Sequence, residues 1–135
     1  MSVLSLVVLV LFFLHQLFAD LPLFILLQVL AAALMVWARL TFGARSFHIA
    51  ANPSAGRLVT NGPYRLIRHP IYSALLLFVW AGVASHWSVF TAGLALLASA
   101  SIVVRILTEE SLLIAHYPEY RAYAERTKRL IPFVF

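Results

Sequence analysis

Long apolar stretches separated by short polar breaks dominate the chain. Each of the four main stretches approaches the ~20 residues that a helix needs to cross ~30 Å of hydrocarbon. The pattern therefore predicts an all-α, polytopic membrane bundle with about four transmembrane helices, at Val3–Ala19, Leu21–Leu40, Pro70–Ser85 and Ser88–Leu107.

Two of the polar breaks are very short. Asp20-Leu21-Pro22 separates the first two stretches, and Ser85-His86-Trp87-Ser88 separates the last two. Connections of this length join antiparallel neighbours, so we expect two tight helical hairpins. The third stretch is the weakest span, since about 16 residues at ~1.5 Å each reach only ~24 Å.

The remaining segments are more polar. Residues 41–69 contain the turn signal Asn61-Gly62-Pro63, so they are expected to form a structured loop. After Leu107 charged and tyrosine residues alternate, and this tail is expected to be helical. We expect a single integral membrane domain over residues 1–135, with hairpins at 1–40 and 70–107, the loop at 41–69 and a binding tail at 108–135.

Composition agrees with a lipid environment. Hydrophobic residues make up 63% of the 135 residues and charged residues only 11%, too few to cover an aqueous surface. The net charge of +5 does not indicate nucleic-acid binding, because Lys and Arg gather in cytoplasmic loops of membrane proteins for topological reasons. The absence of cysteine excludes disulfides, thiolate metal sites and a cysteine nucleophile.

The placement of the basic residues predicts the orientation. All ten lie between the hairpins or after the second one, on one side of the expected bundle: Arg39, Arg45, Arg57, Arg65, Arg68, Arg105, Arg121, Arg126, Lys128 and Arg129. By the positive-inside rule this side is cytoplasmic, together with both termini and any site built there. The short chain favours the inner (plasma) membrane of a prokaryote.

The adjacent acidic pair Glu109-Glu110 lies where the fourth span leaves the membrane. Carboxylates at such a depth usually face a partner or a wet cavity, which indicates a functional site. A structural explanation stays open, because Arg105 and Glu109 are spaced i,i+4 and can pair on one helix. That pairing leaves Glu110, about 100° around the helix, for another cation.

A second, cationic cluster surrounds the expected start of the third span, where Tyr64, Arg65, Arg68, His69 and Tyr72 gather. A helix start carries unpaired N–H groups and a partial positive charge, and with two arginines it favours carboxylate or phosphate. The alternative is a belt of Arg and Tyr side chains that touches lipid headgroups. If both clusters serve one ligand, a zwitterion such as S-adenosylmethionine fits between them, although composition alone does not name it.

The motifs resemble those of the isoprenylcysteine carboxyl methyltransferase and phospholipid methyltransferase superfamily. The resemblance covers about the C-terminal 75 residues and is carried by Glu109-Glu110, Tyr120-x-x-Tyr123, Arg129-Leu130-Ile131-Pro132 and the string Asn61-Gly62-Pro63-Tyr64-Arg65-Leu66-Ile67-Arg68-His69-Pro70-Ile71-Tyr72. Integral-membrane sterol reductases carry a similar Arg-His-Pro-x-Tyr string. The double glutamate and the Arg-x-Ile-Pro ending favour the methyltransferases.

The resemblance implies a methyltransferase with S-adenosyl-L-methionine as cofactor. It places the cofactor against Tyr64, Arg68, His69, Pro70, Tyr72, Glu109 and Glu110. Arg129 and Arg126 then face the methyl acceptor, with Glu110 as a further catalytic candidate, although plain positive-inside charge also explains these arginines. The partners implied are the lipid bilayer and a lipophilic acceptor, an isoprenylcysteine carboxylate or a lipid.

Methyl transfer from a sulfonium requires mainly alignment and exclusion of water. An amine acceptor would also have to lose a proton, with Glu110, His69 or His116 as possible bases. Two other classes stay open: an NADPH-dependent reductase of the sterol-reductase type, and a non-catalytic membrane scaffold or transporter subunit. We expect no metal site, since no His-Glu-x-x-His spacing occurs. The acceptor and the oligomeric state are not fixed by the sequence.

Overall fold

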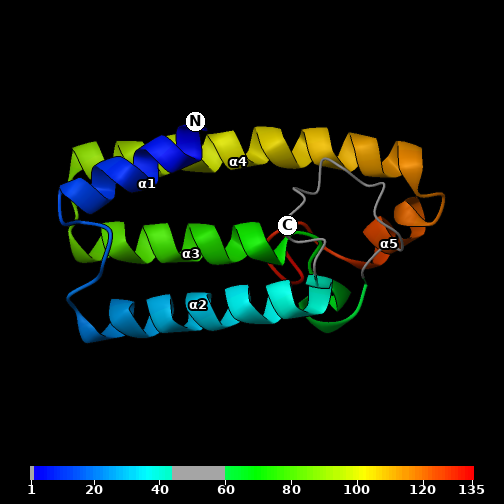
Figure 1. Ribbon diagram of the computed structural model, residues 1–135, viewed down its shortest axis with the longest axis horizontal. Helices are drawn as coiled ribbons and strands as arrows, with labels where there is room; N and C mark the ends of the chain where they lie inside the picture. The colour runs from blue at the N-terminus through cyan, green and yellow to red at the C-terminus, as the bar shows by residue number, and fades with distance from the viewer. Residues whose placement is uncertain (1, 44–59) are drawn as a thin grey trace. The chain divides into compact units, whose positions relative to one another are not determined.

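The computed structural model describes residues 2–43 and 60–135 of the chain. In this part the protein is all-α, and its only strand-like feature is an isolated bridge between Ile67 and Lys128. The described helices are α1 (Val3–Phe13), α2 (Pro22–Phe42), the 3₁₀ helix η2 (Gly62–Arg65), α3 (Pro70–Ser85), α4 (Val89–His116) and α5 (Tyr120–Arg126) (Figure 1). The all-α prediction is confirmed.

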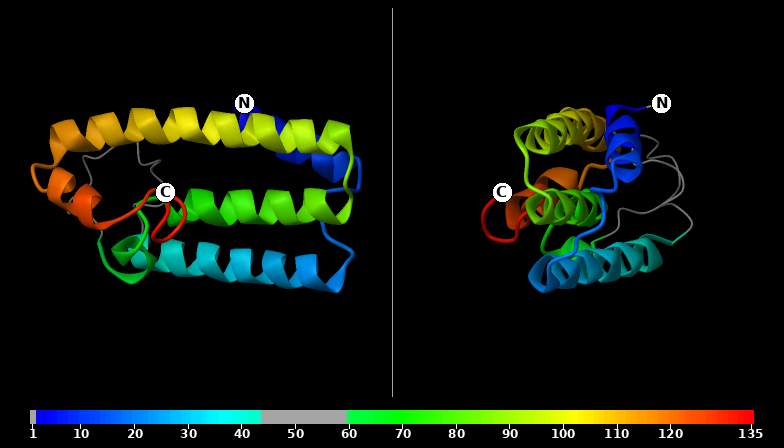
Figure 2. Two further views of the ribbon diagram at one scale, coloured as in Figure 1. Left: turned by 180° about the vertical axis from the view of Figure 1, so that it is seen from behind. Right: turned by 90° about the vertical axis from the view of Figure 1, so that its left-hand side faces the viewer.

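The chain divides into two compact units. Unit 1 comprises Met1–Ala33 and Ala74–Val104, and unit 2 comprises Leu34–Ser73 and Arg105–Phe135. In unit 1, α1 and its share of α2, α3 and α4 run side by side, and the α1–α2 and α3–α4 connections lie at the same end (Figures 1 and 2).

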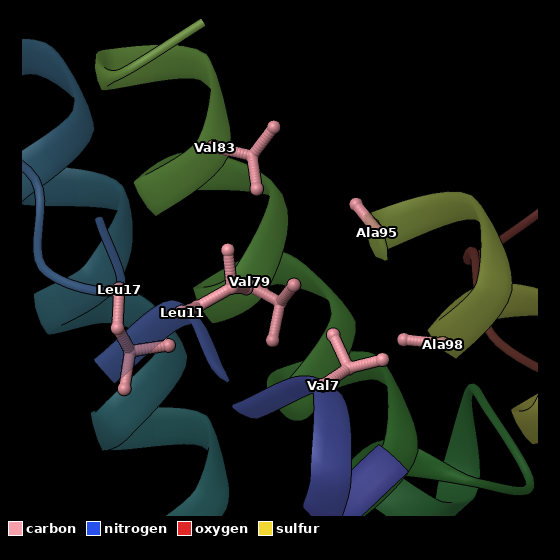
Figure 3. Close-up of a cluster of buried hydrophobic side chains, with 7 residues drawn as sticks. All are labelled: Val7, Leu11, Leu17, Val79, Val83, Ala95 and Ala98. Atoms are coloured by element: carbon pink, nitrogen blue, oxygen red, sulfur yellow. The ribbon is translucent and has the colours of Figure 1, made fainter. Parts of the chain in front are cut away.

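The core of unit 1 is small and aliphatic. Figure 3 shows valines and leucines of α1, of the turn after it and of α3 next to alanines of α4, which let the helices approach closely. The buried members are Val7, Leu11, Leu17, Val79, Val83, Ala95 and Ala98.

The first predicted span is too long. Helix α1 ends at Phe13, and the chain then turns through His15, which has a φ of 58°. The N–H of Gln16 donates to the carbonyl of Leu11 and that of His15 to Phe12, the pattern of a Schellman C-cap. Hydropathy missed this end because the sequence stays apolar past it, so the predicted helix over Val3–Ala19 and the three-residue turn after it were wrong.

A buried glutamine stabilises the non-helical segment that follows. Gln28 is 6% exposed, and its amide donates to the carbonyls of Leu17 (2.8 Å) and Phe78 (3.0 Å) while its oxygen accepts from the N–H of Ala19 (2.9 Å). Gly82 packs against the same segment, where an added Cβ would lie 2.1 Å from the carbonyl oxygen of Leu17. One side chain thus satisfies three backbone groups that helix ends leave without partners.

The later helices agree better with the sequence. Helix α3 has the predicted bounds, and Pro70 stands at its first position, where a missing N–H costs nothing. Helix α4 runs nine residues beyond the predicted Leu107, so Glu109 and Glu110 lie within a continuous helix. The expected helical tail is present as α5.

Two helices are long and apolar enough to cross a membrane: α2 with 21 residues and α4 with 28. The most apolar window of α2 is only 17% buried, so its side chains point mainly away from the protein. A helix in the core of a soluble protein would bury most of such a window. Helices α1 and α3 are apolar but shorter.

Candidate functional site

All the described contacts of the candidate site lie within unit 2. The segment before α3 is anchored there by the chain's last residues: the N–H groups of Arg68 and His69 donate to the carbonyls of Lys128 (2.7 Å) and Arg129 (3.0 Å). The hydroxyl of Ser73 donates to the carbonyl of Leu130 (2.7 Å). These bonds hold the Arg-His-Pro string against residues some 60 positions later.

Glu110 is the centre of the charged cluster. Its Oε1 accepts from the Nε of Arg68 at 2.8 Å and from the Nε2 of His69 at 3.0 Å, and its Oε2 accepts from the Nε of Arg129 at 3.0 Å. The carboxylate is buried, with a side chain that is 9% exposed. Three donors, two of them cationic, compensate for the loss of water around it.

Arg68 connects this cluster to the end of α5. Its Nη1 donates to the carbonyls of Ala124 and Thr127, both at 2.8 Å, and to the hydroxyl of Thr127 at 3.2 Å. The planar guanidinium therefore bonds the carboxylate through one nitrogen and the last turn of a helix through another. This arginine is a structural clamp as well as a charge.

Glu109 has a different environment, although it is the neighbour of Glu110. It is 1% exposed, its Oε1 accepts from the hydroxyl of Tyr72 at 2.5 Å, and the Nε of Arg105 lies 3.5 Å from the same oxygen. Its Oε2 is buried and has no hydrogen-bond partner among the described residues. The ring of Tyr72 stacks on that of His69, with 5.9 Å between their centroids, so the two carboxylates lie on either side of one aromatic pair.

Three tyrosines form a buried cluster at α5. The hydroxyl of Tyr123 donates to the carbonyl of Tyr64 at 2.6 Å, whereas the hydroxyl of Tyr120 is buried without a hydrogen-bond partner in the described part of the chain. Burial raises the pKa of both phenols above the usual range, so both keep their protons at neutral pH. The sequence prediction included neither hydroxyl among the site residues.

The structure brings most of the predicted site residues together, but in two groups. Glu110 collects Arg68, His69 and Arg129, while Glu109 collects Tyr72 and Arg105. The predicted Arg105–Glu109 pair is present, and Glu110 does take other cations. Arg68 and Glu110, which we expected on opposite sides of a ligand, contact each other directly, because their opposite charges neutralise each other when buried.

Three predicted residues lie outside these groups. Tyr64 is buried with its ring stacked on Phe42, at 5.5 Å between centroids, and Pro70 begins α3. The guanidinium of Arg126 lies over the ring of Tyr123 at 5.5 Å, one turn back on α5. Among the described contacts Arg126 has none with Glu110, and its catalytic assignment stays a prediction.

The residues that sequence reasoning missed act mainly through the backbone. The carbonyls of Ala124 and Thr127 hold Arg68, and Ser73 holds Leu130. No residue type announces such a carbonyl in a sequence. The Tyr120-x-x-Tyr123 spacing was noted, and it does mark the buried cluster.

These observations define an all-α protein with two helices long and apolar enough to cross a membrane and with a buried charged cluster in unit 2. The chain belongs to the phospholipid methyltransferase family, whose sequence profile matches residues 20–120.

Two curated relatives are similar over part of the chain. The cobalt-zinc-cadmium resistance protein CzcN of Cupriavidus metallidurans is 40% identical over 76 residues, which are 56% of this chain and 35% of the relative. The nickel-cobalt-cadmium resistance protein NccN of Alcaligenes xylosoxydans xylosoxydans is 34% identical over 76 residues, 56% of this chain and 36% of the relative. The chain thus matches about a third of each relative's length. No solved structure matches.

Proposed function

We propose that the protein is an S-adenosylmethionine-dependent methyltransferase that acts at the membrane interface on a lipophilic acceptor. Family membership supports methyl transfer. The structural observation that carries the proposal is Glu109, a carboxylate 1% exposed whose Oε2 has no partner among the described residues.

A buried carboxylate oxygen without a donor is costly, so a native protein keeps one where a ligand supplies the missing partner. Besides Tyr72, Glu109 has Arg105 at 3.5 Å, a long contact from a side chain that is 34% exposed. The site residues therefore fit a cationic ligand group. S-adenosylmethionine carries an ammonium and a sulfonium, and Glu109 would hold one of them, with His69 and Tyr72 beside it.

When bound, S-adenosylmethionine supplies an electrophilic methyl group on a positively charged sulfur. The residues of this chain then have to align the acceptor and keep water out. Glu110 fixes the two donors that flank it: a carboxylate only accepts, so His69 donates from Nε2, and Arg129 donates from Nε. Arg129 is 33% exposed at its side chain and has further N–H groups for an acceptor oxygen.

The proposal includes the membrane arrangement. Helices α2 and α4 would span the bilayer, the shorter α1 and α3 would complete two hairpins in one domain, and the basic side would face the cytoplasm. A lipid-soluble acceptor would then enter from the bilayer and the cofactor from the cytoplasm. The plasma membrane of a prokaryote is the proposed location.

The direct test of activity is transfer of labelled methyl groups. The purified protein in lipid vesicles is incubated with S-adenosylmethionine labelled at the methyl group, together with farnesylated N-acetylcysteine or with phosphatidylethanolamine. We expect the label to enter the organic extract with one of these acceptors and Glu109→Gln to abolish it. A folded parent that transfers no label to either acceptor or to extracted membrane lipids would count against a methyltransferase.

A further inference from the structure

The phenol of Tyr120 stands out in unit 2. The residue is 2% exposed and its hydroxyl oxygen is fully buried, yet this hydroxyl has no hydrogen-bond partner among the described residues. Buried tyrosine hydroxyls usually find a partner, so an orphaned one requires an explanation.

The ring of Tyr120 is held firmly by its surroundings. Tyr120 is the first residue of α5, its N–H donates to the carbonyl of Tyr117 at 3.2 Å, and its ring meets that of Tyr123 edge to face at 5.7 Å. Tyr123, three residues later, has a hydroxyl that bonds internally to Tyr64. The two phenols therefore share a packed cluster and differ in that only one has an internal acceptor.

The Tyr120 hydroxyl lies beside the Glu110 cluster. Burial raises its pKa and Glu110 raises it further, while Arg68 and Arg129 lower it, so all three charges are within electrostatic range. Two guanidiniums and one carboxylate leave a net positive charge there. Arg129 donates to Glu110 through Nε, which leaves its other N–H groups for an anionic oxygen.

We infer that Tyr120 is a ligand-binding residue whose hydroxyl donates a hydrogen bond to a carboxylate oxygen bound beside Arg129. This inference rests on the proposed function and adds a residue and a ligand chemistry to it. Glu109 receives the cationic part of a ligand, and Tyr120 with Arg129 receives an anionic part. The carboxylate belongs either to the amino-acid part of the cofactor or to the methyl acceptor.

Calorimetry on the full chain in lipid nanodiscs tests this and separates the two sources. One pair of probes is S-adenosylhomocysteine, which has the carboxylate, and 5′-methylthioadenosine, which lacks it. The other pair is farnesylated N-acetylcysteine and its neutral methyl ester. The variant is Tyr120→Phe, which keeps the ring, and the matched control is Tyr123→Phe, which removes a hydroxyl that already has an internal partner.

We expect Tyr120→Phe to weaken one carboxylate probe about tenfold, the effect of losing a hydrogen bond to a charged group, and to leave its uncharged counterpart unchanged. Loss with S-adenosylhomocysteine assigns the carboxylate to the cofactor, and loss with the farnesylated acid assigns it to the acceptor. Without ligand, Tyr120→Phe should unfold at the same or a higher temperature than the parent, whereas Tyr123→Phe should unfold lower.

Equal affinities of the parent and Tyr120→Phe for both acids would overturn the inference and leave the proposed function standing, since the hydroxyl would then hold only a water. A lower unfolding temperature of the ligand-free Tyr120→Phe would likewise overturn it, because the hydroxyl would already be satisfied. A folded parent that binds none of the four probes would overturn the proposed function together with this inference.

Discussion

Adjacent glutamates in one helix have unlike environments, and the difference assigns them different tasks. Glu110 has three donors within 3.0 Å, whereas Glu109 keeps one oxygen without a partner. The sequence presents the two carboxylates as a pair, and position on the helix predicts only that they point about 100° apart. Which of them is internally neutralised depends on Arg68, 42 residues away, and was not predictable.

Glu110 is therefore expected to support the fold. Glu110→Gln removes the negative charge and leaves two guanidiniums in a buried cluster, which should lower the free energy of unfolding by about 3 kcal/mol. The measurement is thermal unfolding in detergent followed by circular dichroism. The control is Glu119→Gln, an exposed carboxylate before α5, which should unfold like the parent. Equal unfolding of Glu110→Gln and Glu119→Gln would contradict the role given to Glu110.

At the scale of elements, Arg68 connects α4 to the end of α5. Arg68→Lys keeps the charge but loses the fork that reaches both Glu110 and the carbonyls of Ala124 and Thr127. We expect faster amide hydrogen exchange over residues 120–130 and faster tryptic cleavage there. Arg65→Lys, at an exposed position of the same segment, should change neither, and an unchanged exchange pattern in Arg68→Lys would show that α5 is held by other contacts.

The turn after α1 depends on a single side chain. Gln28→Met should lower the free energy of unfolding by about 2 kcal/mol or more, because buried backbone groups of Leu17, Ala19 and Phe78 lose their partner. Val29→Leu, on the exposed side of α2, is the control. Thermal unfolding that is the same for both variants would mean that Gln28 does not hold the turn.

The sequence predicted helices well where polar residues mark their ends and poorly where they do not. Pro70 and the Ser85-His86-Trp87-Ser88 break bound α3 as predicted. The end of α1 lies among apolar residues, and the extension of α4 past Leu107 follows from helix propensity in a polar stretch rather than from hydropathy. The site was predictable in its residue types, since they gather near helix ends, but its pairing depends on backbone contacts between distant segments.

At the scale of the whole molecule, the proposed topology has a simple test, because the chain contains no cysteine. Trp87→Cys in the α3–α4 connection should react with a membrane-impermeant maleimide added to intact cells. Glu125→Cys in α5 should react only after permeabilisation. The opposite pattern, or reaction of both variants from outside, would contradict a cytoplasmic site.

The central claim is that unit 2 binds S-adenosylmethionine through Glu109. The most direct measurement is calorimetric binding of S-adenosylmethionine to the purified parent, to Glu109→Gln and to the exposed control Glu119→Gln. Glutamine keeps the acceptor for Tyr72 and removes the charge, so we expect saturable binding by the parent and the control and at least a tenfold loss in Glu109→Gln. A folded parent without binding, or equal affinity in Glu109→Gln, would contradict the account.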